Sequence, residues 1–77
     1  MNRDYLRERV AKILHLLKDE QSVGFYAKAV KVLPEPILDG IIGHVRQSLQ
    51  EGVELDVARK VFTRTAQTRA KAIGVEL

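Results

Sequence analysis

The sequence has no cysteine and no tryptophan, and it holds only two prolines among its 77 residues. Without cysteine the chain has no disulfide and no thiolate ligand for a metal, as is usual in the reducing cytoplasm. Its apolar runs are a few residues long, whereas a helix that crosses a bilayer needs about 20. We therefore expect a cytoplasmic protein that does not contact a membrane.

Aromatic residues are also few, with two Tyr and two Phe. Even so, 45% hydrophobic and 30% charged residues is the composition of a globular chain and not of a disordered one. A domain of this size removes only about 60% of its unfolded surface from water. We expect one domain over residues 1–77, with modest stability unless a partner subunit or a ligand adds to it.

The apolar residues follow the three-to-four-residue spacing of a helix in four separate segments. These segments cover about residues 3–18, 22–33, 36–51 and 56–73. Four such helices on short connections can enclose one core, so the predicted fold is an all-α, compact bundle of four short amphipathic helices. Some apolar residues remain after each helix has buried one face, and we expect them to form an exposed patch: Leu16, Val32, Ile37 and Val53.

Local signals mark the ends of these helices. Asn2 and Ser22 have side chains that can cap the first and second helices. The Pro-Glu-Pro sequence ends the second helix and places Pro36 in the first turn of the third. Gly52 and Gly74 are expected to end the third and fourth helices in the left-handed conformation.

Charge is unevenly distributed, although the net charge is only +3. Residues 1–32 hold seven Lys/Arg and four Asp/Glu, residues 33–56 hold one and five, and residues 57–77 hold five and one. The net charges of the three segments are therefore +3, −4 and +4. No acidic residue lies among the five cations of the predicted fourth helix, which are Arg59, Lys60, Arg64, Arg69 and Lys71.

Part of this helix has the spacing of a single polar stripe. Lys60, Arg64, Gln67 and Lys71 stand at i, i+4, i+7 and i+11, a row about 16 Å long. Such a row can follow a phosphate backbone, with Thr63 and Thr68 as hydroxyl donors. The predicted nucleic-acid-binding residues are Arg59, Lys60, Arg64, Gln67, Thr68 and Lys71, and Lys28 or Lys31 of the second helix would add cations.

Two simpler explanations of the basic helix stay open. Its cations can form a solvated face that suits the negative end of the helix dipole. The acidic segment 33–56 can also neutralise them, within the fold or across a dimer.

Other motifs are weaker. The second and third helices resemble a helix-turn-helix only loosely, because their connection lacks glycine and the third helix is acidic. The Gly40-Ile41-Ile42-Gly43 sequence falls inside a predicted helix, where we expect it to allow close approach of another helix or chain and not to clamp RNA from a loop.

His44 and Ser48 are four residues apart, but no oxyanion-binding element or paired carboxylate accompanies them. His15 stands alone, so the sequence predicts no metal site. We expect no catalytic residues, no cofactor and no small-molecule substrate. The predicted function is a non-enzymatic module that binds DNA or RNA through its basic C-terminal helix. The alternative is a protein-interaction or homo-oligomerisation module that uses complementary acidic and basic segments and exposed apolar surface.

Overall fold

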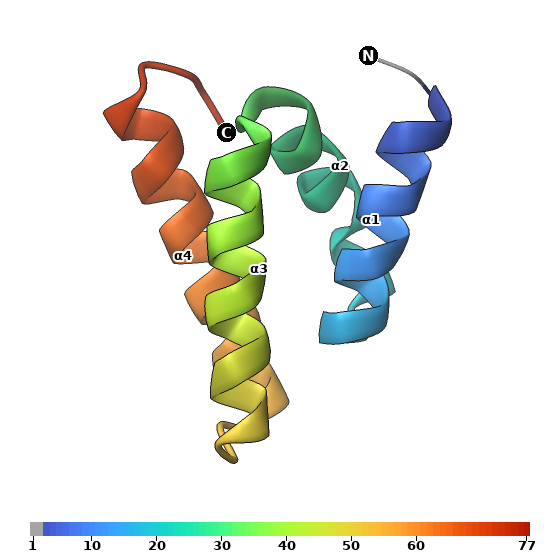
Figure 1. Cartoon of the computed structure of the whole chain (residues 1–77), viewed down its shortest axis with the longest axis vertical. Helices are drawn as coiled ribbons and strands as arrows, with labels where there is room; N and C mark the ends of the chain where they lie inside the picture. Colours follow the sequence, from blue (N-terminus) through green and yellow to red (C-terminus); the bar gives the residue numbers. More distant parts are fainter. Residues whose placement is uncertain (1–2) are drawn as a thin grey trace.

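The computed structural model describes residues 3–77 as a set of helices (Figure 1). In chain order these are α1 (Arg3–Leu17), the short 3₁₀ turn η1 (Glu20–Ser22), α2 (Val23–Val32), α3 (Glu35–Gln50) and α4 (Leu55–Ala72). No β-strand occurs within the described residues 3–77. The all-α prediction is confirmed, and every end of the four α-helices lies within one residue of its predicted position.

The helices form two closely packed pairs. α1 packs chiefly on α2, whereas α3 and α4 run antiparallel and pack along each other (Figure 1). The radius of gyration of the Cα atoms is 11.7 Å, close to the roughly 11.5 Å expected for a compact domain of this length. The fold is therefore a compact four-helix assembly, in which α1 and α3 touch only slightly.

One core is shared by all four helices. At its centre the fully buried rings of Tyr26 from α2 and Phe62 from α4 meet edge to face, with centroids 5.4 Å apart and planes at 89°. The other buried side chains of this core are Val10, Ile13, Leu17, Ala29, Val30, Leu33, Leu38, Ile41, Ile42, Val45, Ala58, Ala66 and Ala70. Since the buried positions of α4 are alanines apart from Phe62, the backbone of α4 can approach its neighbours closely.

The glycine and proline signals at the helix ends are confirmed. Gly52 and Gly74 have φ of +96° and +81°, and Pro36 lies in the first turn of α3. The prediction that the side chain of Ser22 caps α2 is wrong, because Ser22 makes no side-chain capping bond. The turn η1 runs directly into α2, so that the amide of Val23 already donates to the carbonyl of Glu20. Asn2 lies outside the described residues.

The predicted apolar patch does not form as a set. Leu16, Val32 and Ile37 are partly buried against the core, and of the four only Val53 counts among the exposed large apolar side chains. The helices therefore bury a wider face than the single apolar stripe read from their sequence.

Gly40 and Gly43 lie in the middle of α3 and do not serve close packing of helices within the chain. A Cβ added at either position would meet no atom within 4 Å. Both positions are exposed. The expected approach of another helix is therefore not found inside this fold, and both glycines leave open space at the surface of α3.

Candidate nucleic-acid interface

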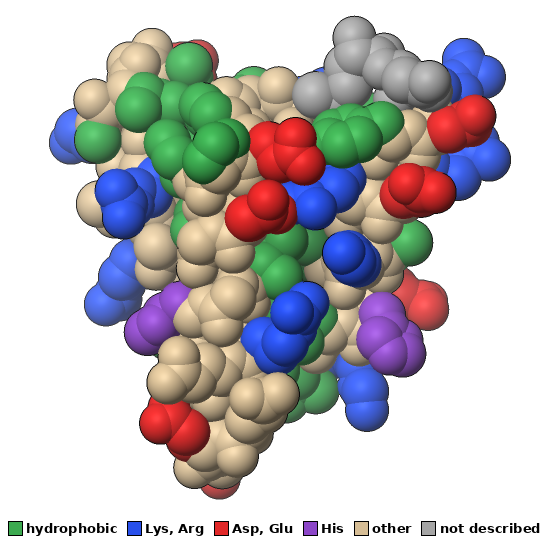
Figure 2. All heavy atoms as spheres, in the orientation of Figure 1, with side chains coloured by type: hydrophobic (Ala, Val, Ile, Leu, Met, Phe, Trp, Pro, Cys, Tyr) green, Lys and Arg blue, Asp and Glu red, His purple; other side chains and the backbone are tan. Residues whose placement is uncertain are grey.

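The α4 row, defined as Lys60, Arg64, Gln67 and Lys71, lies on the outward face of α4. All four side chains are exposed, as is that of Thr68 beside them. The buried residues of α4 lie on the other side of the helix and recur every fourth position. In Figure 2, Lys and Arg side chains line the edge of the molecule on the side of α4. The predicted stripe is therefore available to a ligand along its length.

The middle of the row is slightly hollow. The hollow is shallow and is lined by Arg59, Lys60, Thr63, Arg64 and Gln67. Its walls offer an ammonium, guanidinium groups, a hydroxyl and an amide, all of which can donate hydrogen bonds. Such a surface suits an acceptor that carries negative charge, and a phosphate group is the common biological example.

Arg59 has a second role that the other cations of α4 lack. Its Nε–H donates to the carbonyl oxygen of Leu17 at 2.7 Å, and its Nη2 donates to that of Lys18 at 2.7 Å. The last carbonyls of a helix have no partner within that helix, and Lys18 leaves α1 at a φ of +52°. Arg59 therefore caps α1 and ties it to α4, so that two of its donors are already engaged.

Next to this cap lies a small polar network in the α1–α2 connection. The hydroxyl of the fully buried Tyr26 donates to a carboxylate oxygen of Asp19 at 3.1 Å. Hydrogen bonding from Ser22 is the main cause of a lowered pKa for Asp19, with smaller contributions from Tyr26 and the charge of Arg59. Burial, and then the charge of Asp19, raise the pKa of Tyr26 to about 12.

The acidic segment does not pair with the α4 row. One of its carboxylates, Asp39 of α3, forms an ion pair with Arg9 of α1. Among residues 3–77, no ion pair joins a carboxylate to Lys60, Arg64 or Lys71. Direct neutralisation of the row inside the fold is therefore not found.

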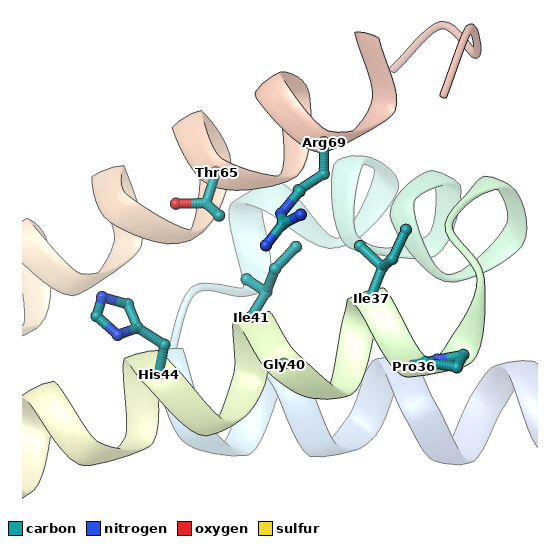
Figure 3. Close-up of a pocket in the computed structure, with 7 residues that line it drawn as sticks. All are labelled: Pro36, Ile37, Gly40, Ile41, His44, Thr65 and Arg69. Atoms are coloured by element: carbon teal, nitrogen blue, oxygen red, sulfur yellow. The ribbon is translucent and has the colours of Figure 1, made fainter. Parts of the chain in front are cut away.

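Arg69 faces another part of the surface. It lines a groove between α3 and α4 together with Pro36, Ile37, Gly40, Ile41, His44 and Thr65. In Figure 3 its side chain extends from α4 toward Ile41 of α3, whereas His44 and Thr65 lie at the far end of the groove. Arg69 is thus set apart from the α4 row.

Other kinds of site find little support in the described residues. The hydroxyl of Ser48 donates to the backbone carbonyl of His44 at 3.0 Å, so its proton is directed to the helix backbone and not to the imidazole. Within residues 3–77, no three His, Cys, Asp or Glu side chains gather closely enough to hold a metal ion. None of the described helices is both long and apolar enough to cross a bilayer.

Comparison of the chain with protein-family models, with curated proteins and with solved structures finds no match. A functional assignment must therefore be argued from the side chains themselves. Of the predicted site residues, the structure places Lys60, Arg64, Gln67, Thr68 and Lys71 together on one exposed face, and it gives Arg59 a structural contact at the border of that face.

Proposed function

We propose that this chain is a non-enzymatic helical module that binds the phosphate backbone of DNA or RNA through the α4 row. The observation that carries the proposal is the exposure of Lys60, Arg64 and Lys71 on one helix face without an ion-pair partner among residues 3–77. A cytoplasmic location belongs to the same proposal, since a chain without cysteine suits a reducing compartment.

The scaffold supports this use of the row. α4 is held in place by its buried face and by the contact of Arg59 with α1, so its outward side chains project from a fixed backbone. Contacts of lysine and arginine with phosphate carry no base information. We therefore expect binding that tolerates many sequences and weakens steeply as salt is added.

The first experiment is a salt titration of binding to a short DNA duplex. With three or four phosphate contacts, the logarithm of the binding constant should fall against the logarithm of salt concentration with a slope of about −3 to −4. The double variant Lys60→Ala/Arg64→Ala removes two of these contacts. Its slope should be smaller by about 2, and its affinity at low salt lower by at least tenfold, roughly.

A matched control is available on α1. Arg3→Ala/Arg7→Ala removes the same charge from two exposed positions that lie outside the row and do not belong to the predicted nucleic-acid-binding cations. If the row is the interface, this control should lose much less affinity than the α4 variant. Equal losses would mean that net charge alone attracts the ligand, and no binding by the unaltered protein at low salt would reject the proposal.

A second candidate function, self-association, is favoured by a groove between α1 and α2. The groove is almost entirely apolar, with two arginines at its border: Arg3, Leu6, Arg7, Val10, Ala11, Leu14, Val23 and Ala27 line it. Val23 in its wall is 43% exposed. A segment that combines apolar with acidic side chains would complement this surface.

The connection between α3 and α4, together with the first turn of α4, is such a segment. Val53 and Val57 are exposed there, and Glu51, Glu54 and Asp56 lie among them. We infer a head-to-tail contact in which this acidic end of one copy docks in the basic-bordered groove of the next. Because the two surfaces differ, the contact would build rings or open chains and not an isologous dimer.

Light scattering over a range of protein concentrations tests this candidate. The mean mass should rise with concentration at low salt and fall back when salt is added. Arg7→Glu and Glu54→Lys should each remain monomeric, because each places like charges across the contact. An unaltered protein that stays monomeric at high concentration and low salt would exclude homo-oligomerisation.

A further inference from the structure

A second basic surface lies on the face of the molecule between α1 and α3. A cleft there is lined by Arg9, Lys12, Asp39, Ile42, Gly43 and Arg46. α1 and α3 make few contacts with each other, so these side chains border a gap between two helices. Figure 2 shows Lys and Arg side chains along this face, between α3 and α1.

The charge of the cleft is positive overall. Three cations line it, Arg9, Lys12 and Arg46, against the single carboxylate of Asp39. Asp39 is already paired with Arg9 and has a side chain that is 52% exposed. The cations come from both helices, so an anion between them would be contacted from two sides.

Arg9 supplies the observation that points to a ligand. Its side chain is only 12% exposed and its pKa is raised, mainly by the hydrogen bond with Asp39. That bond uses Nη2, whereas the buried Nε–H has no acceptor within residues 3–77. Buried donors are almost always paired in folded proteins. The Nε–H of Arg9 is itself closed to solvent, so an anion in the cleft would reach it only after the guanidinium turns, whereas Lys12 and Arg46 are exposed and can meet the anion directly.

Gly43 keeps the cleft open. A Cβ at this position would meet no atom within 4 Å, so packing inside the chain does not require a glycine here. Glycine in the middle of a helix is unfavourable relative to alanine. Its presence at the wall of a basic cleft leaves room for a ligand that a side chain would restrict.

We propose that the α1–α3 cleft binds a phosphate-type oxyanion, held by the side chains of Arg9, Lys12 and Arg46. Lys12 and Arg46 can donate to oxygens of such an anion from exposed positions, and the Nε–H of Arg9 can join them once its guanidinium turns toward the cleft. This site is separate from the α4 row and does not depend on it. The phosphate can belong to a small ligand or to a nucleic acid.

The experiment is an NMR titration of the whole chain with inorganic phosphate, with chloride at matched ionic strength as the reference. The Nε–H signal of Arg9 and the amide signal of Gly43 should shift and saturate with phosphate only. Lys12→Ala/Arg46→Ala should weaken binding by about tenfold or more. A titration without saturation in the millimolar range, or an unchanged response in this variant, would overturn the proposal.

Two glycine variants distinguish an effect on phosphate binding in the cleft from an effect on the stability of α3. Gly43→Ala and Gly40→Ala both replace an exposed mid-helix glycine, and both should raise the urea midpoint of unfolding. Only Gly43→Ala adds a methyl group at the cleft, since Gly40 lines the α3–α4 groove (Figure 3). Phosphate binding should fall in Gly43→Ala and persist in Gly40→Ala, and equal binding in the two would contradict the proposal.

A short single-stranded oligonucleotide then identifies the source of the phosphate. If the backbone of a nucleic acid occupies the cleft, the same two signals should shift at lower concentrations than with inorganic phosphate, and should still do so in Lys60→Ala/Arg64→Ala. A response to inorganic phosphate alone supports the site with a small phosphorylated ligand as its occupant. If nucleic acid does not bind to the α4 row, the response of these two signals to phosphate is unaffected. The two proposals are therefore tested independently.

Discussion

Replacing Arg59 by methionine is expected to lower the free energy of unfolding by about 1.5 to 3 kcal/mol, the typical range for hydrogen bonds that involve a charged group. The substitution keeps much of the aliphatic side chain but removes the donors that reach the carbonyls of Leu17 and Lys18. Both carbonyls lie at the end of α1, where the helix itself offers no donor. Urea unfolding followed by circular dichroism measures the change.

Two further variants identify which property of Arg59 stabilises the fold. Arg59→Lys keeps the charge but offers a single ammonium, which cannot reach both carbonyls as the forked guanidinium does, so it should recover only part of the loss. Lys60→Ala changes the neighbouring exposed cation and should alter stability by less than about 0.5 kcal/mol. Arg59→Met with unchanged stability would show that the cap contributes nothing.

The variant Arg59→Met also distinguishes the cation that stabilises the fold from the cations of α4 that bind the ligand. At a temperature where Arg59→Met remains folded, its salt slope for nucleic-acid binding should stay close to that of the unaltered protein. Lys60→Ala/Arg64→Ala should show the opposite behaviour, with nearly normal stability and a smaller slope. The two phenotypes distinguish a residue that holds α4 in place from residues that face the ligand.

Sequence reasoning located the helices because their signals are local. Apolar spacing, the position of Pro36 and the left-handed ends at Gly52 and Gly74 all depend on residues within a few positions of one another. The side chain of Ser22 does not cap α2, because the turn η1 supplies backbone carbonyls instead, and this turn depends on how α1 ends and α2 begins.

The candidate site was predictable only in part. The spacing of Lys60, Arg64 and Lys71 was sufficient to place them on one face, and the structure adds that this face is exposed. The role of Arg59 was not predictable, since its partners lie more than 40 residues away in the chain. A weak signal was present, because Arg59 follows the buried Ala58 and so stands at the border of the apolar face.

The basic cleft could not be predicted from periodicity at all. Arg9, Lys12 and Arg46 are scattered over two helices, and the sequence does not state how far apart α1 and α3 lie. That distance follows from the packing of α1 on α2 and of α3 on α4, which together leave α1 and α3 with few contacts. Sites between helices of different pairs therefore require the structure, whereas a row along one helix does not.

Raising the pH should destabilise the fold through Tyr26. Its pKa is about 12 in the folded state against 10.0 for an unperturbed tyrosine, so folding favours the protonated hydroxyl. The resulting stabilisation is complete below pH 10 and is lost as the pH rises toward 12. Two pKa units correspond to about 3 kcal/mol, and urea unfolding at a series of pH values measures the loss.

Tyr26→Phe should remove most of this pH dependence. The variant loses the hydrogen bond to Asp19, so near neutral pH it should be less stable by about 1 to 3 kcal/mol. It has no hydroxyl to ionise at position 26, however, and its stability should approach or exceed that of the unaltered protein near pH 12. Tyr5→Phe is the matched control, because Tyr5 lies outside the fully buried core and the control should keep the alkaline loss. A loss in Tyr26→Phe as steep as in the unaltered protein would mean that lysines or Tyr5, and not Tyr26, govern alkaline unfolding.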